Sequence, residues 1–267
     1  MPRKPNRVIT LLTDFGLEDP FVGVMKGVMA GICRRLQFID LTHAVPPQNI
    51  ARASFLLATS FAVFPSGTIH LAIVDPGVGG SRRAVAIRIH EGFLIGPDNG
   101  LFSGVLARSP ALEVRELSEP RFWRTRTPSA TFHGRDVFAP AAAHLASGMA
   151  LSRLGREVDA ASLTLLPQAG WKTAENGAQG VVQDIDRFGN LITSIPASLI
   201  PVAGSWTVQV GAVTANGAAT YASAAPGSLI ALCGSHGYVE VASVNGNAAT
   251  QTAAAVGTAV RLVYVSG

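Results

Sequence analysis

The sequence has little charge, few aromatic side chains and only two cysteines. Charged residues make up 14% of the 267 positions and aromatic residues 7%, whereas soluble proteins usually carry about 25% charged residues. Because the chain is also 48% hydrophobic, this composition excludes a disordered, charge-rich protein. Cys33 and Cys233 lie far apart in the sequence, so they define no disulfide framework and we expect reduced thiols.

The sequence also lacks a long apolar run and a dense basic cluster. The apolar stretch at residues 8–12 is too short for the core of a signal peptide. No uncharged stretch free of Gly, Pro, Asn and Gln reaches the roughly 20 residues of a membrane span. Lys and Arg are scattered, and a net charge of +4 is too small to indicate a nucleic-acid surface. We therefore expect a cytoplasmic protein that binds neither membranes nor nucleic acid.

The few charges are unevenly distributed along the chain. After Arg187 the only charged residues are Glu240 and Arg261. A shift in composition this sharp predicts two different architectures. We place a first domain at residues 1–165, a linker at 166–179 and a second domain at 180–267.

The first domain alternates runs typical of strands with runs typical of helices. Asp19 with Pro20 and Asn49 are start signals for two of these helices, and Pro65 is a stop signal. The alternation predicts a three-layer α/β domain with a largely parallel central sheet. We expect strands at residues 8–12, 38–41, 69–74, 84–89 and 93–95, and helices at 20–36, 50–64 and 136–147.

The second domain consists of short β-branched runs separated by Gly, Asn and Pro. This pattern predicts a small antiparallel β-barrel or sandwich. A surface with so little charge is of the kind that an oligomer interface would cover. The expected strands are residues 181–185, 191–195, 206–210, 228–232, 238–241 and 260–265.

Three polar segments of the first domain adjoin expected strands or helices. Asp14 in Thr-Asp-Phe-Gly and Asp75 in Val-Asp-Pro-Gly-Val-Gly-Gly-Ser-Arg-Arg each follow an apolar strand, and His133 in Phe-His-Gly-Arg-Asp precedes a helix. Open α/β sheets bind ligands beyond the carboxyl ends of their strands. A carboxylate at that edge can accept both hydroxyls of a ribose, and a histidine can orient or deprotonate a water.

Each segment also has a purely structural interpretation. Asp14 could form a turn, the glycines after Asp75 could form a wide turn with a solvated Arg pair, and His133 could be a packing residue. The glycine-rich segment lacks the Gly-Lys-Ser/Thr ending of a phosphate loop. Asp14, Asp75, His133 and Asp136 carry metal-binding atoms, but the HxxxH and CxxC spacings are absent and we expect no metal.

The polar candidates of the second domain lie in loops between its strands. The segment Asp-Arg-Phe-Gly-Asn at 186–190 forms either a plain β-turn or a site in which Phe188 stacks on a base and Asn190 binds an amide-like edge. Glu240 follows Ser-His-Gly-Tyr-Val and is a lone charge in neutral surroundings, so it is either an interface residue or a ligand contact.

Seven motifs in one order resemble a single family over nearly the whole chain. They comprise the segments at 13–16, 74–79, 132–136 and 186–190, together with Asp-Leu-Thr-His at 40–43, Gly-Pro-Asp-Asn-Gly at 96–100 and Gly-Asn-Ala-Ala at 246–249. Each motif is short, but the ordered set is specific. The chain resembles the S-adenosyl-L-methionine (SAM) hydrolases, also called SAM hydroxide adenosyltransferases, whose relatives include the SAM-dependent fluorinase and chlorinase.

The resemblance implies an N-terminal α/β domain, a C-terminal β-barrel and a homotrimer with substrate held between domains of neighbouring subunits. The implied reaction is SAM plus water giving adenosine and L-methionine, without a cofactor. The implied water-positioning trio is Asp75, Arg82 and His133, with Arg83 as the alternative arginine. The implied substrate contacts are Asp14 and Gln48 at the ribose, Phe188, Asn247 and Ala248 near adenine, and Asp186, Asn190 and Ser235 near the methionine part, to which we add Glu240.

The halogenating relatives differ from this chain at three places. They carry a Trp where this chain has Gln48, an extra loop where it is short after Arg83, and a Ser in the halide pocket where it has Gly134. These departures favour hydrolysis over halogenation. The alternatives are a SAM-dependent halogenase such as a chlorinase, a non-catalytic SAM- or adenosine-binding protein, a metal-dependent hydrolase and, last, a nucleic-acid-binding protein.

Overall fold

The computed structural model describes residues 7–202 and 204–265. The chain divides into two compact units, Met1–Leu166 and Pro167–Gly267, each with its own hydrophobic core. The segment 166–179, which the sequence led us to treat as a linker, contains strand β7 (Lys172–Ala174), paired with β8 (Gly177–Ile185) of the second unit. The helices of the described residues are all too short or too polar to cross a membrane.

The described part of the first unit contains a six-stranded sheet in the order β2-β1-β3-β5-β4-β6. The neighbours β2, β1, β3 and β5 run parallel, whereas β4 pairs antiparallel with β5 and β6. The largely parallel sheet is therefore confirmed; β6 was not expected because its sequence, Glu-Val-Arg-Glu, has a single apolar residue. The strands are β1 (Arg7–Thr13), β2 (Leu36–Thr42), β3 (Thr68–Ile73), β4 (Ala84–Arg88), β5 (Gly92–Pro97) and β6 (Glu113–Glu116).

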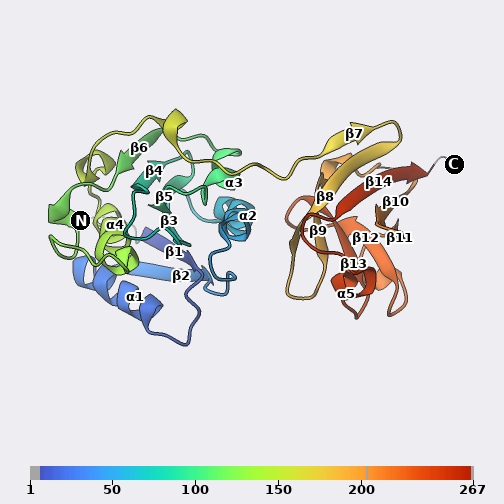
Figure 1. Ribbon diagram of the computed structural model, residues 1–267, viewed down its shortest axis with the longest axis horizontal. Helices are drawn as coiled ribbons and strands as arrows, with labels where there is room; N and C mark the ends of the chain where they lie inside the picture. The colour runs from blue at the N-terminus through green and yellow to red at the C-terminus, as the bar shows by residue number, and fades with distance from the viewer. Residues whose placement is uncertain (1–6, 203, 266–267) are drawn as a thin grey trace, which may run out of the picture. The chain divides into compact units, whose positions relative to one another are not determined.

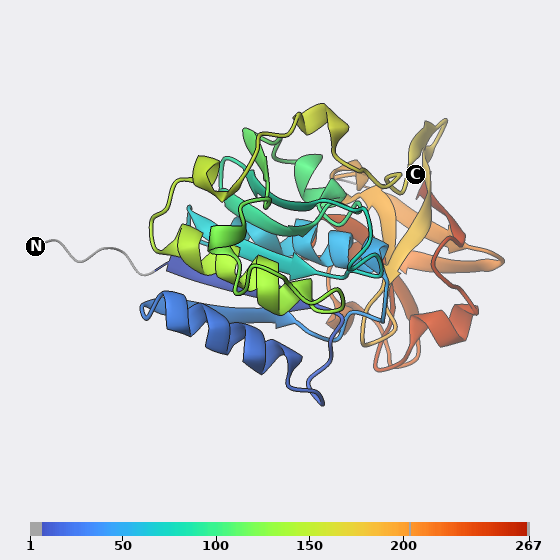
Figure 2. The same ribbon diagram turned by 60° about the vertical axis from the view of Figure 1, so that its left-hand side comes forward.

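Helices cover both faces of this sheet and confirm the three layers (Figure 1). Helices α1 (Phe21–Ile32) and α4 (Ala139–Ala146) lie on one face, and α2 (Ile50–Ser60) and α3 (Ser103–Leu106) lie on the other, as Figure 2 shows from a second direction. Strand β1 alternates between them: Ile9 and Leu11 pack toward α1 and α4, and Leu12 packs toward α2. Short 3-10 turns complete the unit at Phe61–Val63, Pro120–Phe122, Leu151–Leu154 and Ala160–Ser162.

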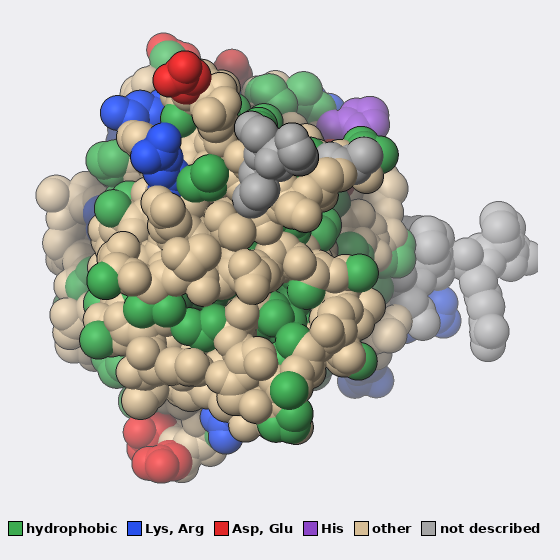
Figure 3. Space-filling view, turned by 90° about the vertical axis from the view of Figure 1, so that its right-hand side faces the viewer, with side chains coloured by type: hydrophobic (Ala, Val, Ile, Leu, Met, Phe, Trp, Pro, Cys, Tyr) green, Lys and Arg blue, Asp and Glu red, His purple; other side chains and the backbone are tan. Residues whose placement is uncertain are grey.

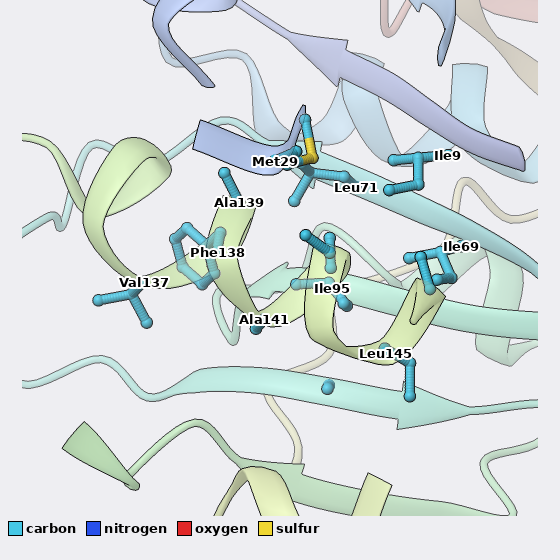
Figure 4. Close-up of a cluster of buried hydrophobic side chains, with 14 of the residues drawn as sticks. Ile9, Met29, Ile69, Leu71, Ile95, Val137, Phe138, Ala139, Ala141 and Leu145 are labelled. Carbon is cyan, nitrogen blue, oxygen red and sulfur yellow. The ribbon is translucent and has the colours of Figure 1, made fainter. Parts of the chain in front are cut away.

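The core under α1 and α4 packs against a charged side chain at its edge. Figure 4 shows its side chains, with Phe138 beside α4 and Leu71 and Ile95 on the strands. Phe138 is fully buried, and burial of such a side chain stabilises the fold by about 1.5–3 kcal/mol. The guanidinium of Arg82 lies 5.4 Å from the centre of the Phe138 ring, so this core also fixes a charged group of the site.

The expected helix at 136–147 begins differently from the prediction. Residues Gly134–Phe138 form a π-helical turn, and the α-helix starts at Ala139. The cause is Pro140, which has no N–H to donate to the carbonyl of Asp136. That carbonyl accepts instead from the backbone N–H of Arg124 at 2.9 Å. Single π-turns of this kind are frequent at functional sites, and this one follows His133.

The other two helices are shorter than predicted. Helix α1 ends at Ile32 because the chain enters β2 at Leu36, and Pro20 is its cap residue without any side-chain cap from Asp19. Helix α2 ends at Ser60 and tightens into a 3-10 turn before Pro65. The Asn49 cap is confirmed, since its side chain accepts from the backbone N–H of Arg52 at 2.9 Å.

A buried histidine of the sheet should make folding sensitive to acid. Burial lowers the pKa of His70 from 6.5 to about 4, although the negative charge of Glu91 acts to raise this pKa. Between these pH values the folded protein binds fewer protons than the unfolded chain, so the free energy of unfolding should fall by about 3 kcal/mol as the pH decreases. Urea unfolding at pH 7 and pH 4 measures the effect. His70→Gln should lose less stability over this range than the wild type, and equal losses would contradict the assignment.

The second unit is a closed β-barrel, as predicted. In its described part seven strands form a ring in the order β14-β10-β11-β12-β13-β9-β8, closed because β8 also pairs with β14. Its pairings are antiparallel except for the short parallel contact of β11 with β12. The elements after β8 are β9 (Leu191–Pro196), β10 (Ser205–Val210), β11 (Val213–Gly217), β12 (Leu229–Cys233), β13 (Tyr238–Ser243), helix α5 (Ala248–Thr252) and β14 (Ala259–Val265), with 3-10 turns at Ala197–Leu199 and Tyr221–Ser223.

The surface of the barrel matches its composition. Figure 3 shows a face of this unit on which backbone, uncharged polar side chains and scattered hydrophobic side chains predominate and charged side chains are few. Some of the exposed hydrophobic side chains are large: Phe188 is 74% exposed and Trp171 42%. Strand β11 was not expected because Val-Thr-Ala-Asn-Gly is rich in small and turn-forming residues.

Candidate active site

A glycine turn at the end of β3 presents Asp75 at the carboxyl edge of the sheet. The turn is closed by hydrogen bonds from Val78 N–H to the Asp75 carbonyl at 3.2 Å and from Gly80 N–H to the Gly77 carbonyl at 3.0 Å. Gly79 has a φ of +76°, and a Cβ there would lie 2.3 Å from the carbonyl oxygen of Ala130. Only glycine permits this approach, so Gly79 joins the turn to the loop that precedes His133.

The structure brings Asp75, Arg82 and His133 together. Arg82 Nε donates to Asp75 Oδ1 at 2.9 Å and Oδ2 at 3.1 Å, and Arg82 Nη2 also donates to Oδ2. The same Nη2 lies 2.8 Å from Nδ1 of His133. The side chains of Arg82 and Asp75 are only 11% and 6% exposed, so water screens their attraction weakly. The trio expected from the resemblance is thus a single hydrogen-bonded cluster.

Arg83, the alternative arginine, lies in a different cluster. Its Nε donates to Asp98 Oδ2 at 2.8 Å, and its two terminal nitrogens donate to Ser162. Asp98 is buried and also accepts from the backbone N–H of Thr164 at 2.8 Å. Arg83 therefore ties the start of β4 to the segment that ends the first unit, and Asp75 and His133 pair with Arg82.

The contact with Arg82 defines the protonation of His133. Arginine can only donate hydrogen bonds, so Nδ1 of His133 must accept, and the neutral ring carries its proton on Nε2. The pKa of His133 is lowered, first by burial and then by the positive charge of Arg82, while the charges of Asp75 and Asp136 oppose the shift. We expected His133 to orient or deprotonate a water. With Nδ1 occupied by Arg82, the neutral ring has an N–H to donate and no free nitrogen to take a proton.

The loop that carries His133 is anchored by a charged pair that the sequence did not single out as an anchor. Asp136 is 1% exposed, and Arg135 donates to its two oxygens at 2.7 and 2.8 Å. The backbone N–H of Ser129 donates to the same carboxylate at 2.9 Å. The hydrogen bonds from Arg135 lower the pKa of Asp136 despite its burial. Asp136, weighed above as a metal-ligand candidate, is thus held by protein donors.

An apolar pocket adjoins the trio. It has a volume of about 120 Å³, and its lining includes Asp75, His133, Phe15, Phe21 and Phe132. The three phenylalanine rings pack edge to face with centroids 5.2–6.0 Å apart. Phe21 and Phe132 were not predicted as site residues from the sequence. Phe132 adjoins His133 in the chain, whereas Phe21 lies seven residues after Asp14 and has no such signal, and the convergence of the two rings is a property of the fold.

Asp14 follows β1, and one of its two carboxylate oxygens accepts a hydrogen bond from the protein. The backbone N–H of Gln48 donates to Asp14 Oδ2 at 2.8 Å. Gln48 adopts a φ of +66°, a left-handed conformation that costs energy for a residue other than glycine. No hydrogen bond among the described residues involves Oδ1 of Asp14, which leaves this oxygen for a ligand. The structure therefore brings Gln48 to Asp14 through its backbone.

In the barrel, the segment at 186–190 packs against the start of α5. Asp186 Oδ1 accepts from the backbone N–H groups of Phe188 and Asn190 at 2.8 and 2.9 Å, and the Asn190 amide donates to Oδ2 at 3.0 Å. Gly189, with a φ of +84°, has no room for a Cβ beside the Asn247 side chain. Asn247 caps α5, and Ala248 is its first residue and is buried. Five of the predicted contacts thus form one cluster.

Glu240 belongs to a buried polar group of the barrel. Tyr221 Oη donates to its Oε1, and His236 Nε2 lies 3.1 Å from Oε2. Burial acts to raise the pKa of Glu240, but the hydrogen bonds with His236 and Tyr221 outweigh it and the net shift is downward. The pKa of Tyr221 is raised by burial, by this hydrogen bond and by the charge of Asp186. Ser235 is exposed in the turn between β12 and β13.

The titratable side chains do not assemble into an evident metal centre. Within residues 7–202 and 204–265, no three His, Cys, Asp or Glu side chains are placed to hold a metal ion together. Both cysteines are free thiols, Cys233 being exposed and Cys33 half-buried.

The fold and the site together define the class of protein. The first unit is an α/β domain with a charged cluster and an apolar pocket at the carboxyl edge of its sheet. The second unit is a β-barrel with its own polar cluster. These features are those of a two-domain protein that binds a small molecule. Residues 9–155 match the SAM hydroxide adenosyltransferase N-terminal domain, and residues 180–261 match the C-terminal domain of the same family. The chain belongs to the SAM hydroxide adenosyltransferase family.

Relatives of known name and structure agree with this membership. The chain is 44% identical over 211 residues to the (R)-S-adenosyl-L-methionine hydrolase of Thermus thermophilus, covering 77% of this chain and 79% of that protein. It is 31% identical over 222 residues to the fluorinase of Actinopolyspora mzabensis, covering 74% of each. The crystal structure of an uncharacterized conserved protein from Thermotoga maritima superimposes with a TM-score of 0.89 at 33% identity, over 96% of this chain and 99% of that chain.

Proposed function

We propose that this protein hydrolyses S-adenosyl-L-methionine to adenosine and L-methionine. A water oxygen attacks the ribose C5′, the C5′–S bond breaks, and its electron pair stays on sulfur, which leaves as the neutral thioether of methionine. One proton of the water passes to solvent. The observation that carries the proposal is the Asp75–Arg82–His133 cluster beside an apolar pocket, in a chain related to proteins named as SAM hydrolases.

The pocket suits the displacement of a sulfonium group. The positive charge on sulfur disappears in the transition state, so surroundings that exclude water favour the reaction. The rings of Phe15, Phe21 and Phe132 supply such surroundings. The attacking water must lie in line with the C–S bond, about 3–3.5 Å from carbon. We place it beside the trio, whose rigid hydrogen bonds orient it.

Each member of the trio has a separate role in this proposal. Asp75 accepts a hydrogen bond from the water at Oδ1, because this oxygen binds only Nε of Arg82 among the described residues and keeps a second lone pair, whereas Oδ2 binds both Nε and Nη2. His133 donates from Nε2–H to the water oxygen because its Nδ1 is occupied by Arg82. The charge of Arg82 favours hydroxide character in the water. The result is an oriented, partly deprotonated water and no covalent enzyme intermediate.

Hydrolysis fits this pocket better than halogenation. A Cβ at Gly134 would lie 3.0 Å from the Phe132 ring and 3.1 Å from the sulfur of Met25, so a serine side chain there would require both neighbours to shift. The chain is also more similar to the hydrolase of Thermus thermophilus than to the fluorinase of Actinopolyspora mzabensis. We therefore place the trio, rather than a halide site, beside the ribose carbon.

Product analysis tests the proposal. The purified protein is incubated with SAM in halide-free buffer containing EDTA, and the products are separated by chromatography. Equal amounts of adenosine and methionine support hydrolysis, and unchanged SAM overturns it. A 5′-chloro product on addition of chloride would instead identify a halogenase. Hydrolysis that occurs only when EDTA is omitted from the buffer would identify a metal-dependent hydrolase.

The pH profile should report on His133. A doubly protonated ring would direct an N–H at Arg82, so it would break the trio and place two positive charges together. Because the pKa of His133 is lowered from 6.5, the neutral form persists through neutral pH, and kcat/KM should fall only as the pH drops below 6.5. Initial rates between pH 5 and 9 measure this. An acid limb with its midpoint above 6.5 would contradict the assignment.

We also propose that the active protein is a cytoplasmic homotrimer without a cofactor. The low charge and exposed hydrophobic side chains of the barrel support an oligomer interface, and the two free thiols support a reducing compartment. Light scattering tests the assembly, since a trimer has three times the mass of the 27.7 kDa chain. A monomer at micromolar concentration would exclude it.

A further inference from the structure

The motif Asp-Leu-Thr-His at 40–43 has no role in the mechanism above, yet its histidine is buried beside the Asp14 loop (residues 13–16). Nδ1 of His43 lies 2.8 Å from Oγ1 of Thr13, the residue before Asp14. Thr13 is fully buried and His43 is 5% exposed. A buried threonine–histidine pair beside Asp14 calls for a physical account, because buried polar groups are costly unless paired.

The hydrogen bonds of this pair continue into the Asp14 loop. Thr13 Oγ1 accepts from the backbone N–H of Phe15 at 3.2 Å, and the carbonyl of His43 accepts from the N–H of Gly16 at 2.9 Å. Gln48, further along the same segment, donates its backbone N–H to Asp14 Oδ2 at 2.8 Å. The segment 43–48 therefore fixes the residues on both sides of Asp14 and the carboxylate itself.

On its other side, His43 faces a second carboxylate. Its Nε2 lies 3.2 Å from Oδ1 of Asp40, and this buried nitrogen has no aligned hydrogen bond among the described residues. Asp40 is itself paired with Lys26 at 2.7 Å. A proton on Nε2 faces the negative charge of Asp40, which leaves Nδ1 to accept from the Thr13 hydroxyl. The order of donors is then Phe15 N–H to Thr13, and Thr13 O–H to His43.

We propose that Thr13 and His43, oriented by Asp40, are positioning residues that hold Asp14 for recognition of the ribose 2′,3′-diol. The inference rests on the proposed function and on the contact between Asp14 and the ribose that the family resemblance implies. The pair acts through the loop and touches no reacting atom. Its consequence is selectivity: loss of the pair weakens binding of nucleosides that carry the diol and spares nucleosides that lack it.

The sheet contains a matched control for this pair. Thr10, three positions earlier on β1, forms the same contact with His70, with 2.9 Å between Oγ1 and Nδ1. Thr10 and His70 are also buried, but the structure gives them no hydrogen bond to the Asp14 loop. Thr10→Val and Thr13→Val remove the same hydroxyl from the same strand. Only the second change should affect recognition of the diol.

Calorimetric titration with adenosine and with 2′,3′-dideoxyadenosine tests the proposal. For Thr13→Val we expect about tenfold weaker binding of adenosine and unchanged binding of the dideoxynucleoside. Thr13→Ser, which keeps the hydroxyl, should restore the preference for adenosine. Thr10→Val should lower the melting temperature and leave the ratio of the two affinities at the wild-type value.

The outcomes separate this proposal from the proposed function. An unchanged affinity ratio in Thr13→Val, or an equal loss in Thr10→Val, overturns the positioning role. A wild-type protein that binds the two nucleosides equally also overturns it, because Asp14 would then not read the diol. A wild-type protein that prefers adenosine but leaves SAM intact overturns hydrolysis alone, and the Thr13 series still decides the role of the pair.

Discussion

Replacing Arg82 with methionine is expected to lower kcat for SAM hydrolysis by about 10³-fold, while SAM still binds. The guanidinium joins Asp75 to His133 and supplies the only positive charge of the trio. Without it, Asp75 loses its partner, His133 loses the contact that fixes its tautomer, and the water loses its orientation. Methionine is similar in length and apolar, so packing on Phe138 is kept. Single-turnover product formation and SAM titration separate the rate from the affinity.

Arg83 provides the control for this prediction. It is the next residue in the chain and is also part of a partly buried ion pair, with Asp98. Arg83→Met should cost about 3 kcal/mol of stability, because a buried carboxylate is left unpaired, and kcat at a temperature where the variant is folded should stay within a few-fold of the wild type. Equal losses of kcat in the two variants would mean that Arg82 acts by stability alone.

Removing the Asp14 carboxylate is expected to raise KM for SAM by about 100-fold, with a smaller effect on kcat. Hydrogen bonds to a charged acceptor contribute about 1.5–3 kcal/mol each, and loss of about 3 kcal/mol corresponds to a factor of about 100. Asp14 lies at the end of β1, where Gln48 orients Oδ2 and leaves Oδ1 open to a ligand. Steady-state kinetics of Asp14→Ala measures the change.

Asp19 is the matched carboxylate for that experiment. It follows the same loop but is exposed at the start of α1, and Asp19→Ala should leave KM and kcat unchanged. If Asp14→Ala lowers kcat with no effect on KM, then Asp14 acts in the chemical step and the assignment to ribose binding is wrong.

Much of the fold and of the candidate site could be predicted from the sequence. The expected strand before Asp75 is apolar apart from His70, and the glycines that follow Asp75 mark a turn at the sheet edge. Asn49 is a helix cap whose signal is entirely local. The split into an α/β domain and a β-barrel followed from strand and helix periodicity together with the loss of charge after Arg187.

What the sequence could not give depends on contacts between distant segments. The choice between Arg82 and Arg83 depends on their distant partners: Arg82 contacts His133 and Arg83 contacts Ser162, about 50 and 80 residues further along the chain. The buried pair of Thr13 and His43 requires the register of β1 against β2. The late start of α4 results from Pro140, but it also needs Arg124 to satisfy the freed carbonyl.

The measurement that tests the central claim most directly is hydrolysis of SAM in water enriched in ¹⁸O, with mass spectrometry of both products. If water attacks C5′, the label enters the 5′-hydroxyl of adenosine, whose mass rises by about 2 Da, and methionine stays unlabelled. The account predicts this result for the wild type and the absence of labelled adenosine for Arg82→Met on the same time scale. Adenosine formed without label, or SAM recovered intact, would contradict attack by an oriented water on the ribose carbon.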